Sequence, residues 1–388
     1  MRDHFHPIRI LHVVERMNRG GVEIWLMHIL RTINRKNFHI DLLVHSAEPG
    51  EFDEEIMALG SKIIRCPHVK NPLLYSIHFN RILKKNQPYH IIHSHVHHFS
   101  GWILFLASMF GIPICISHSH TDSTLVDAKG SLIRKLYLGL MKKLINNYAT
   151  IGIGVSNKAI NALRMSHSSR LHWEVLHCGI NLSPFSLLPH KNILRNEYKI
   201  PEDAIVLGHV GNLILAKNHK FMLEIAHEFM KTTPNSYLLL VGDGELSDGI
   251  KQQAKTLGID QQILFLGTRQ DIPNLLKMMD VFLFPSILEG LPLAVIEAQA
   301  AGLPIVISNS VAKEVDIVPG LLTWMSLSQS ATIWAEACLQ AYKNNEKISQ
   351  EEACKVVSTT SFNILNNIRE LEKIYERRRP DEETGARS

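Results

Sequence analysis

The sequence alternates between short apolar runs and amphipathic stretches, and this alternation occurs twice along the chain. In the first half, apolar runs at 8–14, 39–44, 62–65, 90–93, 113–117 and 149–155 are separated by segments with helical periodicity. In the second half, the apolar runs lie at 204–210, 237–241, 263–266, 281–285 and 304–308. Largely apolar strands that are separated by helices are typical of a parallel sheet with both faces covered. The pattern therefore predicts an α/β fold with two Rossmann-like domains that face one another across a cleft.

The domain boundaries are predicted from chain length and from one break in the periodicity. The chain has 388 residues, more than one compact domain usually contains. Between Gly179 and Pro201 the periodicity is interrupted by three prolines among Asn, Ser and His. We expect a first domain over 1–178, a linker over 179–200, a second domain over 201–360, and a C-terminal helix with a charged tail over 361–388.

The two halves differ in charge. Residues 1–180 hold 21 Lys and Arg against 12 Asp and Glu, and residues 181–388 hold 20 against 25, so +9 and −5 sum to the net charge of +4. The first half also carries 18 of the 22 histidines. It should favour anionic partners, among which a membrane surface is a candidate. Nucleic acid is not expected, because basic and aromatic residues do not cluster together.

Several features point to the cytoplasm. The longest apolar runs are shorter than the roughly 20 residues of a membrane-spanning helix. The first nine residues lack the apolar core of a signal peptide. The five cysteines are scattered and contain no C-x-x-C pair, which is consistent with a reducing compartment.

The segment Val281–Ile307 holds the strongest candidate for a binding site. A strand ends at Pro285, a loop follows, and a helix begins near Pro292. Backbone amides in the first turn of a helix lack intrahelical partners and attract phosphate. Those amides belong to Leu291, Leu293 and Ala294.

Two carboxylates flank the predicted phosphate position. Glu289 would repel a bare phosphate, but its carboxylate can accept hydrogen bonds from sugar hydroxyls. Glu297, just over one turn into the helix, suits the hydroxyls of a ribose. In isolation both would be read as solvated surface carboxylates. Next to phosphate-binding amides they indicate a nucleotide-sugar site.

The residues of this segment resemble a known family. The pattern E-G-L-P-x4-E from Glu289 to Glu297 resembles the E-x7-E signature of the family 4 retaining glycosyltransferases, which have the GT-B fold. Further matches are E-A-Q-A-A-G-L-P at 297–304, V-G-D-G-E-L at 241–246, F-L-G-T-R-Q-D-I at 265–272, C-G-I-N at 178–181 and G-G-V-E at 20–23. The resemblance covers nearly the whole chain and is strongest to bacterial exopolysaccharide and capsule glycosyltransferases.

The resemblance implies roles for individual residues. Glu289 would orient the donor sugar and Glu297 would bind the ribose. Gly242 and Arg269 would contact the nucleotide, and Gly20 and Gly21 would approach the donor diphosphate, although two glycines after a strand are also typical of a tight turn.

The residues expected at the diphosphate depart from the family at one position. The family has Gly-Arg-x4-Lys, and in this chain Lys217 matches while Asn212 replaces the Arg. An Asn can donate a hydrogen bond but carries no charge. Lys220 or His219 are candidates for replacing the missing cation.

Histidines gather at two predicted strand ends, in H-S-H-V-H-H at 93–98 and H-S-H-T-D at 118–122. The spacing H-x-H on a strand puts both rings on one face, so a metal site must be weighed. Few carboxylates accompany these histidines, and no D-x-D motif suited to a bridging cation is present, so we expect neither a metal nor another cofactor. The resemblance implies that one histidine, His120 or alternatively His118, contacts the transferred sugar; a structural role at the strand end also remains open.

Residues 132–145 form a basic amphipathic pattern, with apolar pairs every four residues and Lys or Arg between them. Such a helix usually covers a sheet with its apolar face, and this is the favoured interpretation. It can also lie on anionic lipid if part of the apolar stripe stays exposed.

Taken with the resemblance, the sequence predicts a retaining glycosyltransferase of the hexosyl-transferring type. It would move a sugar from a nucleotide donor, most simply a UDP-sugar, to a glycan or lipid-linked acceptor in exopolysaccharide or capsule biosynthesis. The enzyme would be cytoplasmic, with peripheral association to the inner face of the membrane as an option. A nucleotide-sugar epimerase on the same fold and a non-catalytic or metal-binding protein that uses the His clusters are the alternatives.

Overall fold

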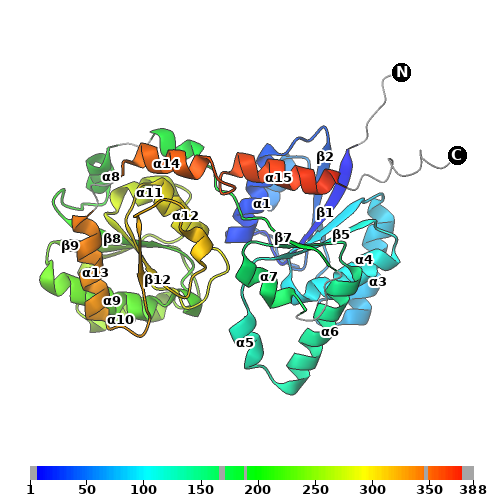
Figure 1. The fold of residues 1–388 in the computed structure, drawn as a ribbon, viewed down its shortest axis with the longest axis horizontal. Coiled ribbons are helices and arrows are strands. Elements are labelled where there is room, and N and C mark those ends of the chain that lie inside the picture. Colours follow the sequence, from blue (N-terminus) through cyan, green and yellow to red (C-terminus); the bar gives the residue numbers. More distant parts are fainter. Residues whose placement is uncertain (1–6, 166–170, 188–189, 345–347, 378–388) are drawn as a thin grey trace. The chain divides into compact units, whose positions relative to one another are not determined.

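The computed structural model describes residues 7–165, 171–187, 190–344 and 348–377. It divides into two compact units (Figure 1), one formed by residues 1–179 and 364–388 and the other by residues 180–363. The charged tail expected after the last helix lies almost entirely outside the described residues.

The first unit is built on a seven-stranded parallel sheet with the order β3-β2-β1-β4-β5-β6-β7. Its strands are β1 (Ile8–Val14), β2 (Phe38–Val44), β3 (Ile63–Arg65), β4 (Ile91–Ser94), β5 (Ile114–Ser119), β6 (Ile151–Gly154) and β7 (Trp173–Val175). Its helices are α1 (Gly21–Thr32), α2 (Asp53–Ala58), α3 (Pro72–Asn86), α4 (Ser100–Met109), α5 (Thr124–Ala128), α6 (Leu132–Tyr148), α7 (Asn157–Leu163) and α15 (Ile364–Glu376).

The second unit has a six-stranded parallel sheet with the order β10-β9-β8-β11-β12-β13. Its strands are β8 (Ile205–Val210), β9 (Ser236–Val241), β10 (Ile263–Phe265), β11 (Val281–Phe284), β12 (Ile305–Ser308) and β13 (Leu322–Met325). Its helices are α8 (Lys191–Glu197), α9 (His219–Thr232), α10 (Ser247–Thr256), α11 (Ile272–Met278), α12 (Leu293–Ala300), α13 (Ala331–Lys343) and α14 (Gln350–Ser358).

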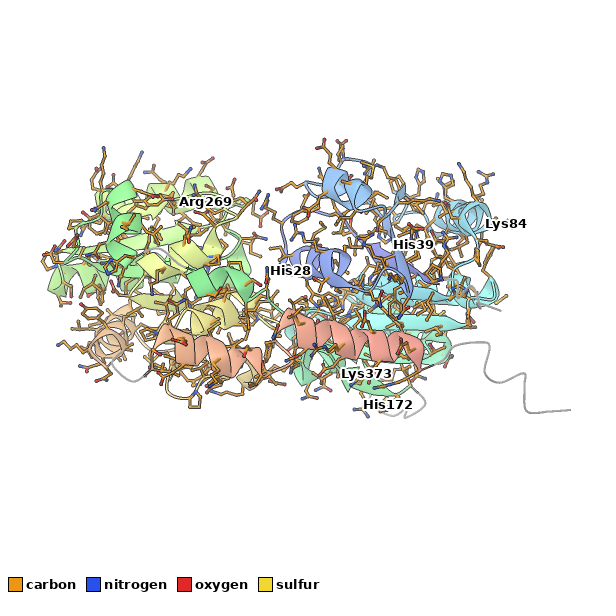
Figure 2. All side chains as sticks on the ribbon, turned by 90° about the horizontal axis from the view of Figure 1, so that it is seen from above. His28, His39, Lys84, His172, Arg269 and Lys373 are labelled. Carbon is orange, nitrogen blue, oxygen red and sulfur yellow. The ribbon has the colours of Figure 1, made fainter. Side chains whose placement is uncertain are left out.

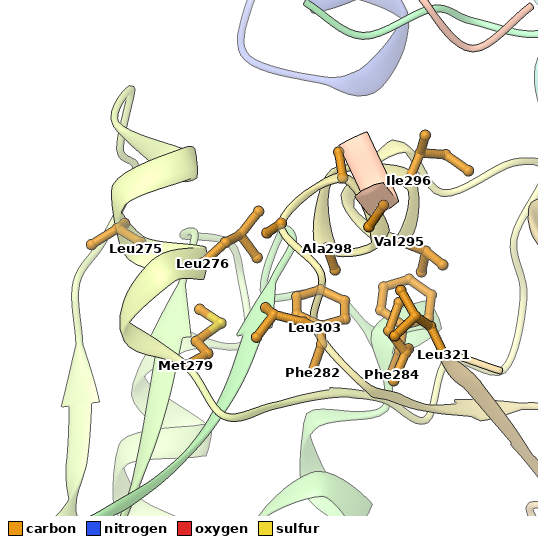
Figure 3. Packing of buried hydrophobic residues seen from close by; sticks show 14 of the residues in the cluster. Leu275, Leu276, Met279, Phe282, Phe284, Val295, Ile296, Ala298, Leu303 and Leu321 are labelled. Carbon is orange, nitrogen blue, oxygen red and sulfur yellow. The ribbon is translucent and has the colours of Figure 1, made fainter. Parts of the chain in front are cut away.

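Successive residues of the second sheet enter two different cores, because side chains alternate between the faces of a strand. Phe282 and Phe284 of β11 pack with α11, α12 and α14, and Figure 3 shows Phe282 beside Leu303 and Phe284 beside Leu321. Leu283 and its alternate neighbours pack on the other face with α9, α10 and α13. The apolar strands predicted from the sequence are therefore buried on both sides.

Residues 180–200 differ from the expected linker, since they are part of the second unit. Phe185 and Leu194 are buried in the same core as Phe282. The Arg195 guanidinium is also buried, donating to the carbonyl of Met278 and pairing with Asp280 at 2.6 Å. Of the prolines that interrupt the periodicity, Pro184 lies within the short helix η2 (Ser183–Leu187), and Pro201 lies between α8 and β8.

The last helix, α15, packs against α1 in the first unit (Figure 1). Trp25 of α1 donates its indole N–H to Oδ1 of Asn367 at 2.6 Å, and the amide of Asn367 donates to the carbonyl of His177. Tyr375 is fully buried, and its hydroxyl contacts His93 at 2.8 Å. A segment from the end of the sequence therefore completes the core of the unit that begins it.

Candidate functional site

In the second unit, the strand order reverses between β8 and β11. From β8 the chain proceeds to β9 and β10 on one side, whereas β11 leads to β12 and β13 on the other. Open parallel sheets bind ligands beyond the carboxyl ends of the strands at such a reversal. Lys217 follows β8 and Glu289 follows β11, and Lys217 Nζ lies 2.6 Å from Glu289 Oε1. The two residues that the sequence singled out on separate motifs are therefore in direct contact.

Lys217 lies in the loop after β8 and Glu289 in the loop after β11, and backbone contacts between these loops explain why the two side chains meet. The amide of Ile287 donates to the carbonyl of Ala216 at 2.8 Å, which joins the loops directly. Asn218 adopts a left-handed conformation with φ of 58°, and its side-chain amide donates to the carbonyl of Pro285 at 3.2 Å. Because Asn tolerates this conformation better than most residues, it can end the short helix η3 (Leu215–Lys217) and begin α9 at once.

The helix predicted at the phosphate position begins where the sequence placed it. α12 starts at Leu293, with Pro292 as the preceding cap residue. Glu297 lies on this helix, and burial raises the pKa of its carboxyl to about 7. Among the described residues, none donates a hydrogen bond to that carboxylate. The ionised form is therefore poorly stabilised until a donor such as a ribose hydroxyl approaches.

Gly242 and Arg269 are held by contacts within the protein. Gly242 has φ of 134°, and a Cβ there would lie 2.1 Å from the carbonyl oxygen of Gly211. The loops after β8 and β9 therefore approach as closely as only glycine allows. The Arg269 guanidinium pairs with the Asp271 carboxylate through two contacts of 2.8 and 2.9 Å. Its role at a nucleotide stays a prediction.

The structure removes one of the two candidates for the missing cation at Asn212. Asn212 is exposed, and His219 is buried nearby at the start of α9. Burial, with a further contribution from Lys217, lowers the pKa of His219 to about 4, so its ring is neutral at pH 7. His219 therefore cannot replace the Arg. Lys220 is exposed and remains a candidate.

In the first unit, His93 and His95 of one motif meet His118 and His120 of the other at the carboxyl ends of three adjacent strands. His12 of β1 lies opposite His93 of β4, and His118 of β5 projects from the same face. His95 and His120 follow directly after β4 and β5, so five rings form one cluster. His12 was not among the residues singled out from the sequence. A single histidine in an apolar strand does not indicate a site by itself. Only the order of the strands in the sheet brings His12 close to the two motifs.

Burial lowers the pKa of every ring in this cluster. The pKa of His12 and of His120 falls to about 3, and those of His93, His95 and His118 fall well below the usual value for the same reason. The five imidazoles are therefore neutral at pH 7. Each then offers one donor and one acceptor nitrogen to its neighbours.

The two histidines proposed for the transferred sugar differ in exposure. His118 is completely buried, so it cannot contact a ligand without a rearrangement of its neighbours. His120 is partly exposed. His120 is therefore the more accessible of the two rings, and the contact of either with the transferred sugar stays a prediction.

The glycine pair is less open than the sequence suggests. Gly20 precedes α1, and a Cβ at this position would lie 2.3 Å from a carboxylate oxygen of Glu23. Burial raises the pKa of Glu23. An anion beside Gly20 would therefore meet this acidic side chain. Around Gly21 the space is open.

The basic amphipathic helix does not use its apolar stripe as favoured from the sequence. Leu132 and Ile133 are 74% and 81% exposed, and Leu136 and Leu140 are exposed as well. Only Leu138, Met141 and Ile145 of α6 are buried. The expected burial of the apolar stripe therefore holds for the second half of α6 and is wrong for the first half, and the helix that α6 packs against is α4. None of the helices in the described ranges is long and apolar enough to span a membrane.

Comparison with known families identifies both halves of the chain. Residues 19–184 match the family described as Glycosyltransferase Family 4, and residues 190–350 match that described as Glycosyl transferases group 1. The computed structure is similar to the crystal structure of Anabaena Alr3699/HepE in complex with UDP and glucose, with a TM-score of 0.77, 18% identity, and coverage of 95% of this chain and 99% of that one. That likeness supports the GT-B fold.

Three relatives share most of their length with the chain. The putative glycosyltransferase EpsF of Bacillus subtilis (strain 168) is 33% identical over 339 residues, covering 86% of this chain and 87% of EpsF. The capsular polysaccharide biosynthesis glycosyltransferase CapH of Staphylococcus aureus is 30% identical, with coverage of 78% and 81%. The UDP-Gal:alpha-D-GlcNAc-diphosphoundecaprenol alpha-1,3-galactosyltransferase of Escherichia coli is 27% identical, with coverage of 80% and 81%. The chain therefore belongs to the family 4 glycosyltransferases, with the GT-B fold and relatives in polysaccharide biosynthesis.

Proposed function

We propose that the protein transfers a sugar, with retention of configuration, from a UDP-linked donor to a lipid-linked glycan at an anionic membrane surface. The observation that carries the donor site is the contact between Lys217 and Glu289 at the strand-order reversal of the second sheet. A cation and a carboxylate beside the first turn of α12 match the two ends of a nucleotide sugar. The names of the HepE complex and of the Escherichia coli enzyme support UDP as the nucleotide.

In this proposal, donor binding separates the ion pair. Lys217 and the backbone amides of Leu293 and Ala294 bind the diphosphate and stabilise the negative charge that develops on it as it leaves. Glu289 then accepts hydrogen bonds from sugar hydroxyls, and Glu297 accepts them from the ribose. The acceptor hydroxyl passes its proton to the leaving diphosphate as the new glycosidic bond forms on the same face of the sugar. No nucleophile from the protein is needed for that route.

Binding of UDP tests the donor site. Lys217→Ala should weaken UDP binding about 10- to 100-fold, since a hydrogen bond to a charged group contributes about 1.5–3 kcal/mol. The matched control is Lys231→Ala, which removes an exposed lysine that pairs with Glu228 at the end of α9. Isothermal titration of UDP into the three proteins measures the effect. Equal affinities for all three would reject the donor site.

An assay with the donor alone separates transfer from the epimerase alternative. A transferase releases UDP slowly by hydrolysis, whereas an epimerase converts the donor to an isomer and releases none. Chromatography of each UDP-sugar after incubation with the protein distinguishes the products. Release of UDP with a sugar of unchanged anomeric configuration would support the retaining mechanism, and inversion would reject it.

The membrane part of the proposal is supported by the first half of α6. Leu132, Ile133, Leu136 and Leu140 form an exposed apolar surface on this helix, beside the exposed Lys135 and Lys143. Helices with this composition bind at the boundary of headgroups and acyl chains, and each Lys near anionic lipid contributes about 1 kcal/mol. The lipid-linked substrate in the name of the Escherichia coli relative supports an acceptor at such a surface.

Vesicle flotation tests this surface. The natural chain should float with vesicles that contain phosphatidylglycerol, and the double variant Ile133→Ser/Leu136→Ser should not. Ile193→Ser is the control, because Ile193 is 58% exposed in the second unit. Flotation that is equal in the double variant, or equal with neutral vesicles, would contradict membrane docking through α6.

A further inference from the structure

The five clustered histidines are linked by hydrogen bonds in a single chain. On one side, His12 Nδ1 lies 2.8 Å from His95 Nε2, and His95 Nδ1 lies 2.9 Å from His120 Nε2. On the other, His93 Nε2 lies 3.1 Å from His118 Nδ1. The hydroxyl of Tyr375 joins the two sides through contacts with His12 at 3.1 Å and with His93 at 2.8 Å.

One ring nitrogen of the cluster has no hydrogen-bond partner among the described residues. His118 Nε2 is buried, and no described residue forms a hydrogen bond with it. Whether it carries the proton or the lone pair, a buried and unpaired imidazole nitrogen is unfavourable. One nitrogen each from His95, His118 and His120 lie within 4.8 Å of one another, so the ring with the unpaired atom belongs to a compact group of three.

The partners of these three rings match those of metal-binding histidines. In such sites the ring nitrogen that does not bind the metal forms a hydrogen bond to a second residue, which fixes the orientation of the ring. His95 has this contact to His12, His118 has it to His93, and His120 Nδ1 lies 3.8 Å from Cys178 Sγ. The nitrogens that remain are Nδ1 of His95 and Nε2 of His118 and His120.

From this arrangement we propose that His95, His118 and His120 bind a divalent transition metal ion of the Zn²⁺ class. Three imidazoles are a ligand set of zinc sites that keep one position for water or substrate. In a tetrahedral site with Zn–N distances of about 2.0–2.1 Å, ligand nitrogens lie about 3.4 Å apart. His95 and His120, now 2.9 Å apart, would have to separate by only about half an ångström. The ion would take the place of the proton between them, which moves from Nε2 to Nδ1 of the neutral His120 ring, and it would give His118 Nε2 a partner.

The ligands of this site belong to the first unit, whereas Lys217 and Glu289 belong to the second. This site also changes what His120 can do. With the ion bound, Nε2 of His120 is a metal ligand and cannot contact a sugar hydroxyl directly. The two roles of His120 are therefore alternatives, and metal binding can be measured without a transfer assay.

Cobalt provides the test, because tetrahedral Co²⁺ has visible absorption bands that report its ligands. The full chain, first freed of metal with a chelator, should bind one equivalent of Co²⁺ with these bands, and Zn²⁺ should displace it. His120→Gln and His118→Gln should each weaken binding by at least about 100-fold, since even loss of a partner outside the ligand set costs about 10- to 100-fold. Circular dichroism and metal-free unfolding temperatures check folding. If the buried His118→Gln does not fold, the partly exposed His120→Gln carries the test.

Two control variants separate this site from other histidines. His172 (Figure 2) is exposed in the same unit, and His172→Gln should leave Co²⁺ binding unchanged. His97→Gln alters a second possible group, formed by His97, His98 and Asp127, and should also bind normally. The proposal is overturned if the natural chain shows no tetrahedral Co²⁺ spectrum, if His120→Gln binds as well as the natural chain, or if His97→Gln abolishes binding.

Discussion

The partly buried carboxyl of Glu297 should make the stability of the protein depend on pH in a specific way. Its pKa is about 7 in the folded chain, against 4.5 for an ordinary glutamate. Between these values the folded state holds a proton that the unfolded state has lost. The free energy of unfolding therefore falls as pH rises through this window. The largest loss, above pH 7, is about 3 kcal/mol, at 1.36 kcal/mol for each pKa unit.

The substitution Glu297→Gln removes this dependence, because an amide of similar size does not ionise. The difference in free energy of unfolding, variant minus natural chain, is measured at pH 5 and at pH 8. It should be larger at pH 8 by about 2–3 kcal/mol, because only the natural chain loses stability over this range. Unfolding in urea at both pH values gives the difference. Parallel pH profiles for the two proteins would refute the assignment of a raised pKa to Glu297.

The same carboxyl predicts how UDP binding responds to pH. Ribose hydroxyls donate to the ionised carboxylate, so UDP should select that form and bind more tightly at pH 8 than at pH 6. At pH 7 binding should release about half a proton, because the carboxyl is then about half protonated. Titration calorimetry in buffers of different ionisation enthalpy measures this release. No proton release, or release retained by Glu297→Gln, would contradict the contact with ribose.

Three further substitutions follow from the structure. Asn212→Arg should tighten UDP binding by about 1 kcal/mol, or about fivefold, by calorimetry; unchanged or weaker binding would mean that no vacant cation position exists. Asn367→Ala should lower the free energy of unfolding by about 1–3 kcal/mol in urea, because it leaves the buried Trp25 N–H unpaired; an unchanged free energy of unfolding would contradict this. Gly242→Ala should cost at least about 1 kcal/mol, since its added methyl meets backbone at a positive φ; an unchanged melting temperature would contradict it.

The sequence predicted the elements whose residues carry a local signal. Apolar runs such as Val281–Pro285 correspond to buried strands because burial on both faces requires apolar residues at every position. The short edge strands β7 and β13 were missed. Trp173 and Trp324 in these strands are only partly buried, and polar neighbours interrupt the run. An edge strand covers less apolar surface, so its sequence is less constrained.

The site was predictable where its residues form motifs and not where distant elements meet. Lys217 and Glu289 were each identified, but their direct contact depends on the order of β8 and β11, which no local pattern fixes. The same holds for His12 beside His93. The exposure of α6 was hidden for another reason. An apolar stripe has the same sequence whether it covers a sheet or faces outward, so only packing distinguishes the two.

The place of α15 bears on the order in which the molecule is made. Residues 364–376 lie at least 185 positions after Gly179 in the sequence, yet they complete the core of the first unit. As the chain leaves the ribosome, the sheet of this unit is synthesised first, but Trp25 and His93 must wait for Asn367 and Tyr375. The second unit, contained between these segments, can fold while the first is still open. During synthesis the polar groups of the first unit that α15 covers in the folded protein therefore stay exposed until residues 364–376 have been made.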